Sequence, residues 1–211
     1  QTKNGLTFNA NYTFGNSVVH NEATSSVNTS NWLNMEAVSS RNYIGRSTSD
    51  FDMGHRIFAL LSKKFKYMRG KMATTVSFVY NGQSGSTYSY TMSGNGFIGD
   101  GATFNDLMYI PKDRAEMDLM SFPTNGALTE TIQKDQFEEF IKSDKYMSKN
   151  RGKFAERNGA RAPFTNIVDA NIQQDFSVNV GKVQHTLSLR FDIFNLTNLI
   201  DKNAGRQYFF N

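Results

Sequence analysis

The sequence predicts an all-β protein: part of the wall of an antiparallel transmembrane β-barrel, with about five strands and long extracellular loops. Three observations predict this fold class. Five segments alternate apolar and polar residues with a period of two, and the links between them are long, short, long and short in turn. No stretch approaches the roughly 20 consecutive apolar residues of a membrane-spanning helix, so a transmembrane helix is excluded.

The first and fifth expected strands alternate most strictly. In residues 6–14, apolar side chains occupy the even positions and Thr or Asn the odd ones, over about the ~9–11 residues that a tilted spanning strand needs. From Thr186 onward, one face is polar or charged (Thr186, Ser188, Arg190 and Asp192) and the other is apolar (Leu187, Leu189, Phe191 and Ile193). Such two-faced strands suit a wall between lipid and water.

The three central strands are expected at residues 52–65, 72–80 and 167–178. The third has an apolar face made of Met72, Val76, Phe78 and Tyr80, and its alternation continues through Tyr88 and Tyr90. The apolar face of the fourth consists of Val168, Ala170, Ile172, Phe176 and Val178. In the second strand, the sequence leaves open which face is the apolar one, because Arg56 shares a face with Phe58 and Leu60.

The links follow the pattern of an outer-membrane barrel, with extended outside loops and tight periplasmic turns. Residues 15–51 and 92–165 are the long links, and residues 66–71 and 179–182 are short turns that contain Gly70 and Gly181. All three prolines lie in the second long link, where they break no strand. Within that link, residues 132–147 have the apolar spacing of a short helix, with Glu138 and Glu139 left in solvent.

Composition excludes several classes of protein. There is no cysteine, so disulfides and cysteine nucleophiles are excluded. The net charge of +4 is scattered rather than gathered into a patch, so we expect no nucleic-acid partner. The aromatic content of 13% fits girdles at a membrane interface or a β core. No nucleophile elbow or paired-carboxylate site is recognisable, so the chain is not expected to be an enzyme.

Four segments in this order resemble the TonB-dependent outer-membrane receptors of the Oar-like group, which are related to the SusC-like transporters of Bacteroidota. They are YNGQSG with YSY at residues 80–90, NDLMYIP at 105–111, NRGKFAERNG at 150–159 and FDIFNLTN at 191–198. The resemblance covers nearly the whole chain. It implies a bacterial outer-membrane location, a 22-stranded barrel filled by an N-terminal plug, and nutrient import powered by the proton gradient through TonB.

The resemblance also implies that residues 1–211 are the C-terminal part of such a barrel, without the plug and the final strand. An odd strand count agrees, because closed bacterial barrels have an even one. The expected partners are the TonB system and the plug, outer-membrane lipid or lipopolysaccharide, and a surface lipoprotein.

Two groups of residues are candidates for function in such a receptor. An outside vestibule for the ligand would use the aromatic side chains of Tyr88, Tyr90, Phe97 and Phe104. Lumen-facing contacts to the plug would use Asp169, Asp175, Arg190 and Asp192, since a buried unpaired charge is costly.

A calcium site is a weaker candidate. The oxygen-rich loop after residue 93 offers Asn95, Asp100, Asn105 and Asp106 as ligands. Its spacing departs from known calcium loops because Phe97 and Ile98 occupy ligand-type positions, which favours a simple Asn/Gly turn cluster. Therefore no metal or other cofactor is firmly expected.

The basic segment 151–161 allows two interpretations. Its cations could anchor the long loop to carboxylates of neighbouring loops, or contact an anionic lipopolysaccharide headgroup. The alternative to both is a solvated loop without such contacts, and loop anchoring is favoured over it.

Two functional alternatives remain open. The strands of a soluble β-sandwich module that presents loops to a ligand would also alternate apolar and polar residues. Such a module would not explain why long and short links follow one another in turn. A receptor-like barrel could instead serve surface assembly or export rather than uptake.

Overall fold

The computed structural model describes residues 4–94, 98–99, 101–122, 124 and 126–208. It divides into two compact units. The sheet unit comprises Gln1–Asn16, Met53–Ser86 and Ala162–Asn211, and the loop unit comprises Ser17–Asp52 and Thr87–Arg161. The loop unit is therefore built from the two long links, and each unit is described by itself.

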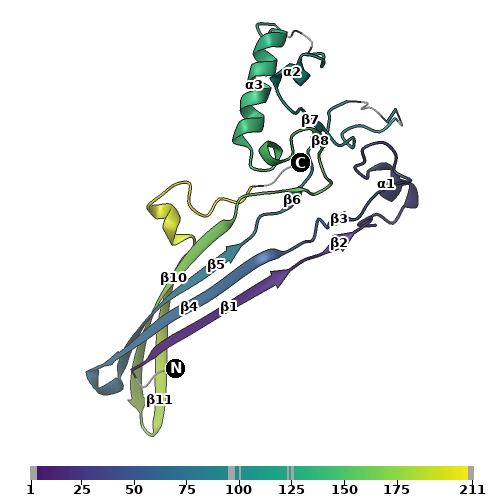
Figure 1. Cartoon of the computed structure of the whole chain (residues 1–211). Helices are drawn as coiled ribbons and strands as arrows, with labels where there is room; N and C mark the ends of the chain where they lie inside the picture. Colours follow the sequence, from purple (N-terminus) through teal and green to yellow (C-terminus); the bar gives the residue numbers. More distant parts are fainter. Residues whose placement is uncertain (1–3, 95–97, 100, 123, 125, 209–211) are drawn as a thin grey trace. The chain divides into compact units, whose positions relative to one another are not determined.

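The sheet unit contains one five-stranded antiparallel sheet in the order β1-β4-β5-β10-β11 (Figure 1). This confirms the predicted all-β, antiparallel wall. The strands are β1 Leu6–Gly15, β4 Gly54–Tyr67, β5 Met72–Gln83, β10 Thr165–Val180 and β11 Val183–Ile193. A 3-10 turn, η3 Leu196–Leu199, follows β11.

The strand ends differ from the predicted ones by up to three residues. The β4–β5 turn, which includes η1 Met68–Gly70, and the two-residue turn between Val180 and Val183 are both tight. Gly70 and Gly181 have positive φ values of 85° and 63°, a conformation that glycine adopts without steric cost. The short turns therefore lie at one end of the sheet, and both long links attach at the other.

The register of the sheet settles the phase of β4, which the sequence left open. Tyr12 of β1 pairs with Ile57, and Ile57 pairs with Gly82 of β5. Because residues directly opposite in an antiparallel pair point to the same face, Ile57 shares the apolar face of β1. Arg56, Phe58 and Leu60, which alternate with Ile57 along β4, lie on the other face.

The loop unit contains short elements around a small apolar core. Three two-stranded ladders pair β2 Val18–Val19 with β3 Ser47–Thr48, β6 Thr87–Tyr88 with β9 Ala160–Arg161, and β7 Tyr109–Ile110 with β8 Lys153–Phe154. The helices are α1 Asn28–Leu33, α2 Arg114–Met117, α3 Glu130–Ser143 and the 3-10 turn η2 Met147–Lys149. The core consists of Ile110, Met117, Ile141, Met147 and Ala155. In the part of the chain that is described, no helix is long and apolar enough to cross a membrane.

Helix α3 ends earlier than predicted, at Ser143 rather than at residue 147. Asp144 leaves the helical conformation, with ψ at 130°. Its carboxylate accepts hydrogen bonds from the backbone N–H groups of Tyr146 (2.9 Å) and Met147 (2.7 Å). This side chain competes for the backbone donors and begins a separate turn, as Asp does at helix ends.

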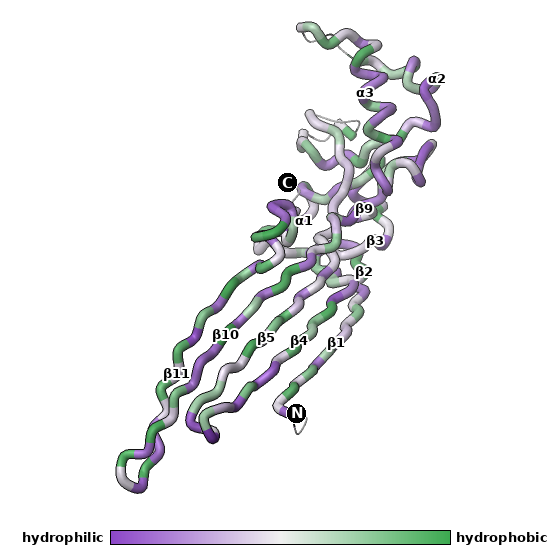
Figure 2. Tube along the Cα trace, turned by 90° about the vertical axis from the view of Figure 1, so that its left-hand side faces the viewer, coloured by the Kyte–Doolittle hydropathy of each residue, from purple (hydrophilic) through white to green (hydrophobic). Residues whose placement is uncertain are grey.

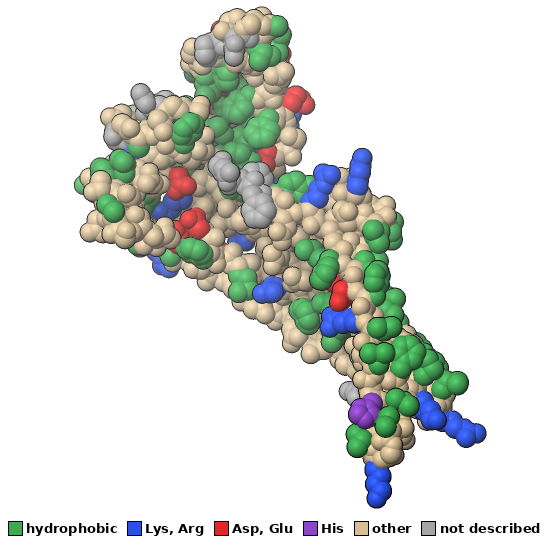
Figure 3. Space-filling view, turned by 180° about the vertical axis from the view of Figure 1, so that it is seen from behind, with side chains coloured by type: hydrophobic (Ala, Val, Ile, Leu, Met, Phe, Trp, Pro, Cys, Tyr) green, Lys and Arg blue, Asp and Glu red, His purple; other side chains and the backbone are tan. Residues whose placement is uncertain are grey.

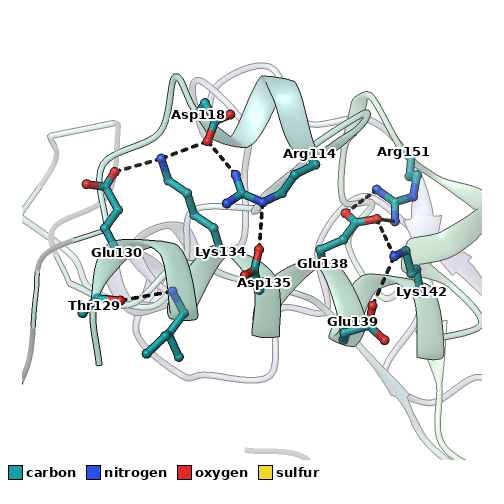
Figure 4. Close-up of polar contacts among 11 residues, drawn as sticks. Arg114, Asp118, Thr129, Glu130, Lys134, Asp135, Glu138, Glu139, Lys142 and Arg151 are labelled. Carbon is teal, nitrogen blue, oxygen red and sulfur yellow. Dashed lines mark hydrogen bonds and ion pairs between the residues drawn. The ribbon is translucent and has the colours of Figure 1, made fainter. Parts of the chain in front are cut away.

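Ion pairs fasten α3 to its neighbours (Figure 4). Arg114 of α2 contacts Asp118, which directly follows α2, at 2.5 Å and Asp135 of α3 at 3.1 Å. Glu138 is not left in solvent as predicted, since Arg151 holds both of its carboxylate oxygens at 2.9 and 3.1 Å. A bidentate pair of this kind fixes the orientation of both side chains.

Candidate functional site

The apolar sides of all five strands fall on one face of the sheet. One row of paired residues crosses the whole sheet, from Phe8 through Leu61, Phe78 and Ala170 to Ile193. Figure 2 shows the alternation of hydrophobic and hydrophilic residues along the strands, and Figure 3 shows hydrophobic side chains gathered over the lower part of the sheet.

This apolar face is exposed. Phe8 is 69% exposed and Leu187 is 63% exposed. A soluble β-sandwich would bury such a face against a second sheet, yet among the described residues of the sheet unit no second sheet covers it. An apolar surface of this extent requires an apolar neighbour, and a lipid bilayer supplies one.

One cluster of polar side chains on the apolar face is hydrogen-bonded internally. Near the short turns, the Gln174 Oε1 atom accepts hydrogen bonds from the hydroxyls of Tyr67 and Thr74, each at 2.7 Å. These three residues come from β10, β4 and β5. Because the donors and the acceptor are paired, the cluster can face lipid at a lower cost than separate polar groups would incur.

The opposite face carries an ion network, although Phe58 and Leu60 of β4 also lie on it. Asp175 of β10, only 8% exposed, lies 3.0 Å from the Nζ atom of Lys64 of β4. Its other carboxylate oxygen, Oδ1, accepts hydrogen bonds from Gln173 and Ser188, each at 2.8 Å. The network joins three strands across the sheet.

The other three predicted lumen residues also lie on this polar face. Arg190 forms an ion pair with Asp192 at 2.8 Å on the same strand, and Asn171 also donates to Asp192. Asp169 accepts a hydrogen bond from the backbone N–H of Asn195 at 2.8 Å. All four charged residues thus have partners within the sheet unit. Their contact with a plug stays a prediction.

In the loop unit, the structure brings together two of the predicted vestibule residues. The hydroxyls of Tyr88 and Tyr90 lie 3.1 Å apart, and Tyr90 donates a hydrogen bond to Asp144 at 2.8 Å. The Tyr90 ring stacks on Tyr146 and packs edge-on against Phe140. The pKa of the Tyr90 hydroxyl is raised, mainly by burial and to a lesser extent by the hydrogen bonds to Tyr88 and Asp144. Tyr90 therefore helps to build the loop core.

The structure does not gather all of the predicted vestibule and calcium residues. Phe104 is 65% exposed, whereas Phe97 lies outside the described residues, as do Asn95 and Asp100. Asp106 is buried and accepts a hydrogen bond from the backbone N–H of Ile98 at 2.9 Å. Asn105 is buried as well and donates to the backbone of Leu33. In the described stretches of chain, no group of three or more acidic, His or Cys side chains is arranged to hold a metal.

The basic segment 151–161 anchors one long link to the other, which confirms the favoured interpretation. Arg157 donates to the Ser47 hydroxyl at 2.6 Å and to the Val19 carbonyl at 3.1 Å. Arg161 pairs with Asp52. These contacts join segments 109 to 138 residues apart within the loop unit.

Sequence reasoning missed a cavity of about 480 Å³ in the loop unit. Its lining includes Glu36, Tyr43, Arg46, Phe154 and Arg157. The pKa of Glu36 is raised, mainly by burial and also by the nearby carboxylate of Asp50. The positive charge of Arg157 lowers it in part. These residues belong to both long links, and no local motif marks them in the sequence.

Comparison with protein families gave one result that covers most of the chain. The sequence model described as the outer membrane beta barrel domain matches residues 1–203. Comparisons with curated proteins and with solved structures gave no match.

Proposed function

The chain belongs to the outer membrane β-barrel domain family, and from this premise we propose that it forms part of the wall and outer loops of a TonB-dependent transporter. The transporter would import a nutrient ligand with energy from the proton gradient. The family places the chain in the bacterial outer membrane and favours a structural or transport role over catalysis.

The observation that carries the proposal is the register of the sheet. It aligns the apolar residues of five strands on one face and an ion network around Asp175 on the other. A wall with hydrocarbon on one side and a hydrated interior on the other needs this division. The network on the interior side supports a lumen that contains water and polar protein surface.

The folded loop unit supports a role in ligand capture. Ion pairs, a buried core and the anchoring contacts of Arg157 hold its two links together. A cavity of about 480 Å³ lies within it, within the size range of pockets that bind small molecules. The coupling to TonB rests on the resemblance of the four sequence segments described above.

Growth and uptake test this proposal. A strain without the protein and one that expresses it would be grown on a panel of single nutrients at limiting concentration. We expect a growth defect on one nutrient class, and uptake of that radiolabelled nutrient that a protonophore abolishes. Passive diffusion through a pore would continue after the protonophore is added.

A different result would support the alternative role in surface assembly or export. In that case uptake of every nutrient would be unchanged, while proteins at the cell surface, measured by surface biotinylation, would be lost in the strain without the protein. That outcome would overturn the import proposal.

A further inference from the structure

The short-turn end of the sheet is cationic. The β4–β5 turn region contains Lys66, Arg69 and Lys71, and the β10–β11 turn contains Lys182. The sequence has no Asp or Glu between residues 53 and 99, nor between residues 176 and 191. Figure 3 shows Lys and Arg side chains at this tip, beside the hydrophobic side chains of the sheet. The nearest acid on β10, Asp175, is engaged by Lys64.

A groove of about 430 Å³ lies at the β4–β5 turn and combines this charge with apolar surface. Its apolar lining consists of Met68, Met72 and Phe176, and its cations are Arg69 and Lys71. Met72 and Phe176 are cross-strand partners on the apolar face. The groove therefore continues the lipid-facing surface and ends at two positive charges.

The backbone of the turn supports a role for these side chains. Met68 and Arg69 both adopt positive φ values, 51° and 56°. This left-handed conformation is costly for residues other than Gly, Asn and Asp. Such strain often persists where a side chain has a function, and here the two strained residues both line the groove.

We propose that this groove binds an anionic phospholipid. Arg69 and Lys71 hold its phosphate, and an acyl chain lies against Met68, Met72 and Phe176. Among the described residues that line the groove there is no carboxylate for the ammonium group of a zwitterionic headgroup, so a headgroup with net negative charge fits better. The inference rests on the membrane orientation proposed above, in which short turns face the periplasm, but it does not depend on transport.

Native mass spectrometry tests the site. The protein would be reconstituted in nanodiscs with equal amounts of phosphatidylglycerol and phosphatidylethanolamine, and the lipids that it retains would be counted. Each cation near an anionic surface changes partitioning by about fivefold, so the R69Q/K71Q variant, which loses two cations, should retain about 25-fold less phosphatidylglycerol. The conservative R69K/K71R variant should retain it.

Matched controls make the result decisive. K202Q/R206Q removes the same two types of charge from exposed positions that follow β11, and it should retain phosphatidylglycerol like the unchanged protein. Gel-shift on heating would confirm that each variant is folded. Equal retention by R69Q/K71Q and the unchanged protein would overturn the proposal, and so would equal retention of both lipids by the unchanged protein. Competition by millimolar inorganic phosphate would point to a simple anion site and would also overturn it.

Discussion

The Nζ atom of Lys64 lies 3.0 Å from the Oδ2 atom of Asp175, although the two residues are 111 positions apart and strand β5 lies between their strands. We predict that Lys64→Met destabilises the sheet more than the double variant Lys64→Met/Asp175→Asn does. The single change leaves a carboxylate without its cation, whereas the double change removes both charges. Urea unfolding of the protein from lipid vesicles measures the free energy of unfolding of the single and the double variant. Additive losses of stability in the two single variants would show that the pair does not interact.

A charge on the apolar face should destabilise the protein in the membrane. Ile172 lies on the apolar face of β10 and the adjacent Asn171 on the polar face. We predict that Ile172→Lys costs about 2–4 kcal/mol of folding free energy in a bilayer, whereas Asn171→Lys costs far less because its side chain stays beside Asp192. Unfolding from vesicles gives both values. An equal cost at the two positions would contradict the assignment of the lipid face.

The close contact at Gly159 gives a test of the loop unit. A Cβ atom at this position would lie 2.6 Å from the Tyr146 hydroxyl and 2.7 Å from its ring. We predict that Gly159→Ala destabilises the loop unit by about 1–3 kcal/mol, as other overpacking changes do. Gly45→Ala is the matched control, because nothing lies within 4 Å of its added Cβ. Limited proteolysis of the folded protein should cut the first variant faster and leave the second unchanged.

Glu36 should make the stability of the loop unit depend on pH. Burial, and then the carboxylate of Asp50, raise its pKa in the folded state above the ordinary value of 4.5. Its protonation therefore stabilises the loop unit fully below pH 4.5, and this contribution is lost as the pH rises through the folded-state pKa. We predict that Glu36→Gln removes this dependence and makes the loop unit more resistant to proteolysis at pH 7. Identical proteolysis rates for the two proteins between pH 5 and 7 would contradict the prediction.

Local sequence predicted the strands well for a physical reason. Successive side chains of a strand point to opposite faces, so the alternation of Phe8, Ala10 and Tyr12 with polar residues identifies both the strand and its two faces. In β4 the alternation is weaker, because Phe58 and Leu60 share a face with Arg56. There the phase followed only from the pairing of Ile57 with Tyr12 and Gly82.

The loop unit was less predictable. The apolar spacing of α3 was visible, but its end was not, because the choice between helix and turn depends on where the carboxylate of Asp144 finds donors. Tyr90 could be chosen as an exposed aromatic residue, whereas its contacts with Tyr146, Phe140 and Asp144 appear only in three dimensions. The groove at the β4–β5 turn also needed the structure, since it combines Met68 with Phe176.

The sequence by itself determined that this protein is a two-faced antiparallel wall with long and short links, because side-chain alternation and turn residues are local properties of the chain. Only the tertiary structure decided which residues meet across strands and between the links, such as Lys64 with Asp175 and Arg157 with Ser47. Register, burial and ion pairing depend on contacts between distant residues, and no local pattern contains them.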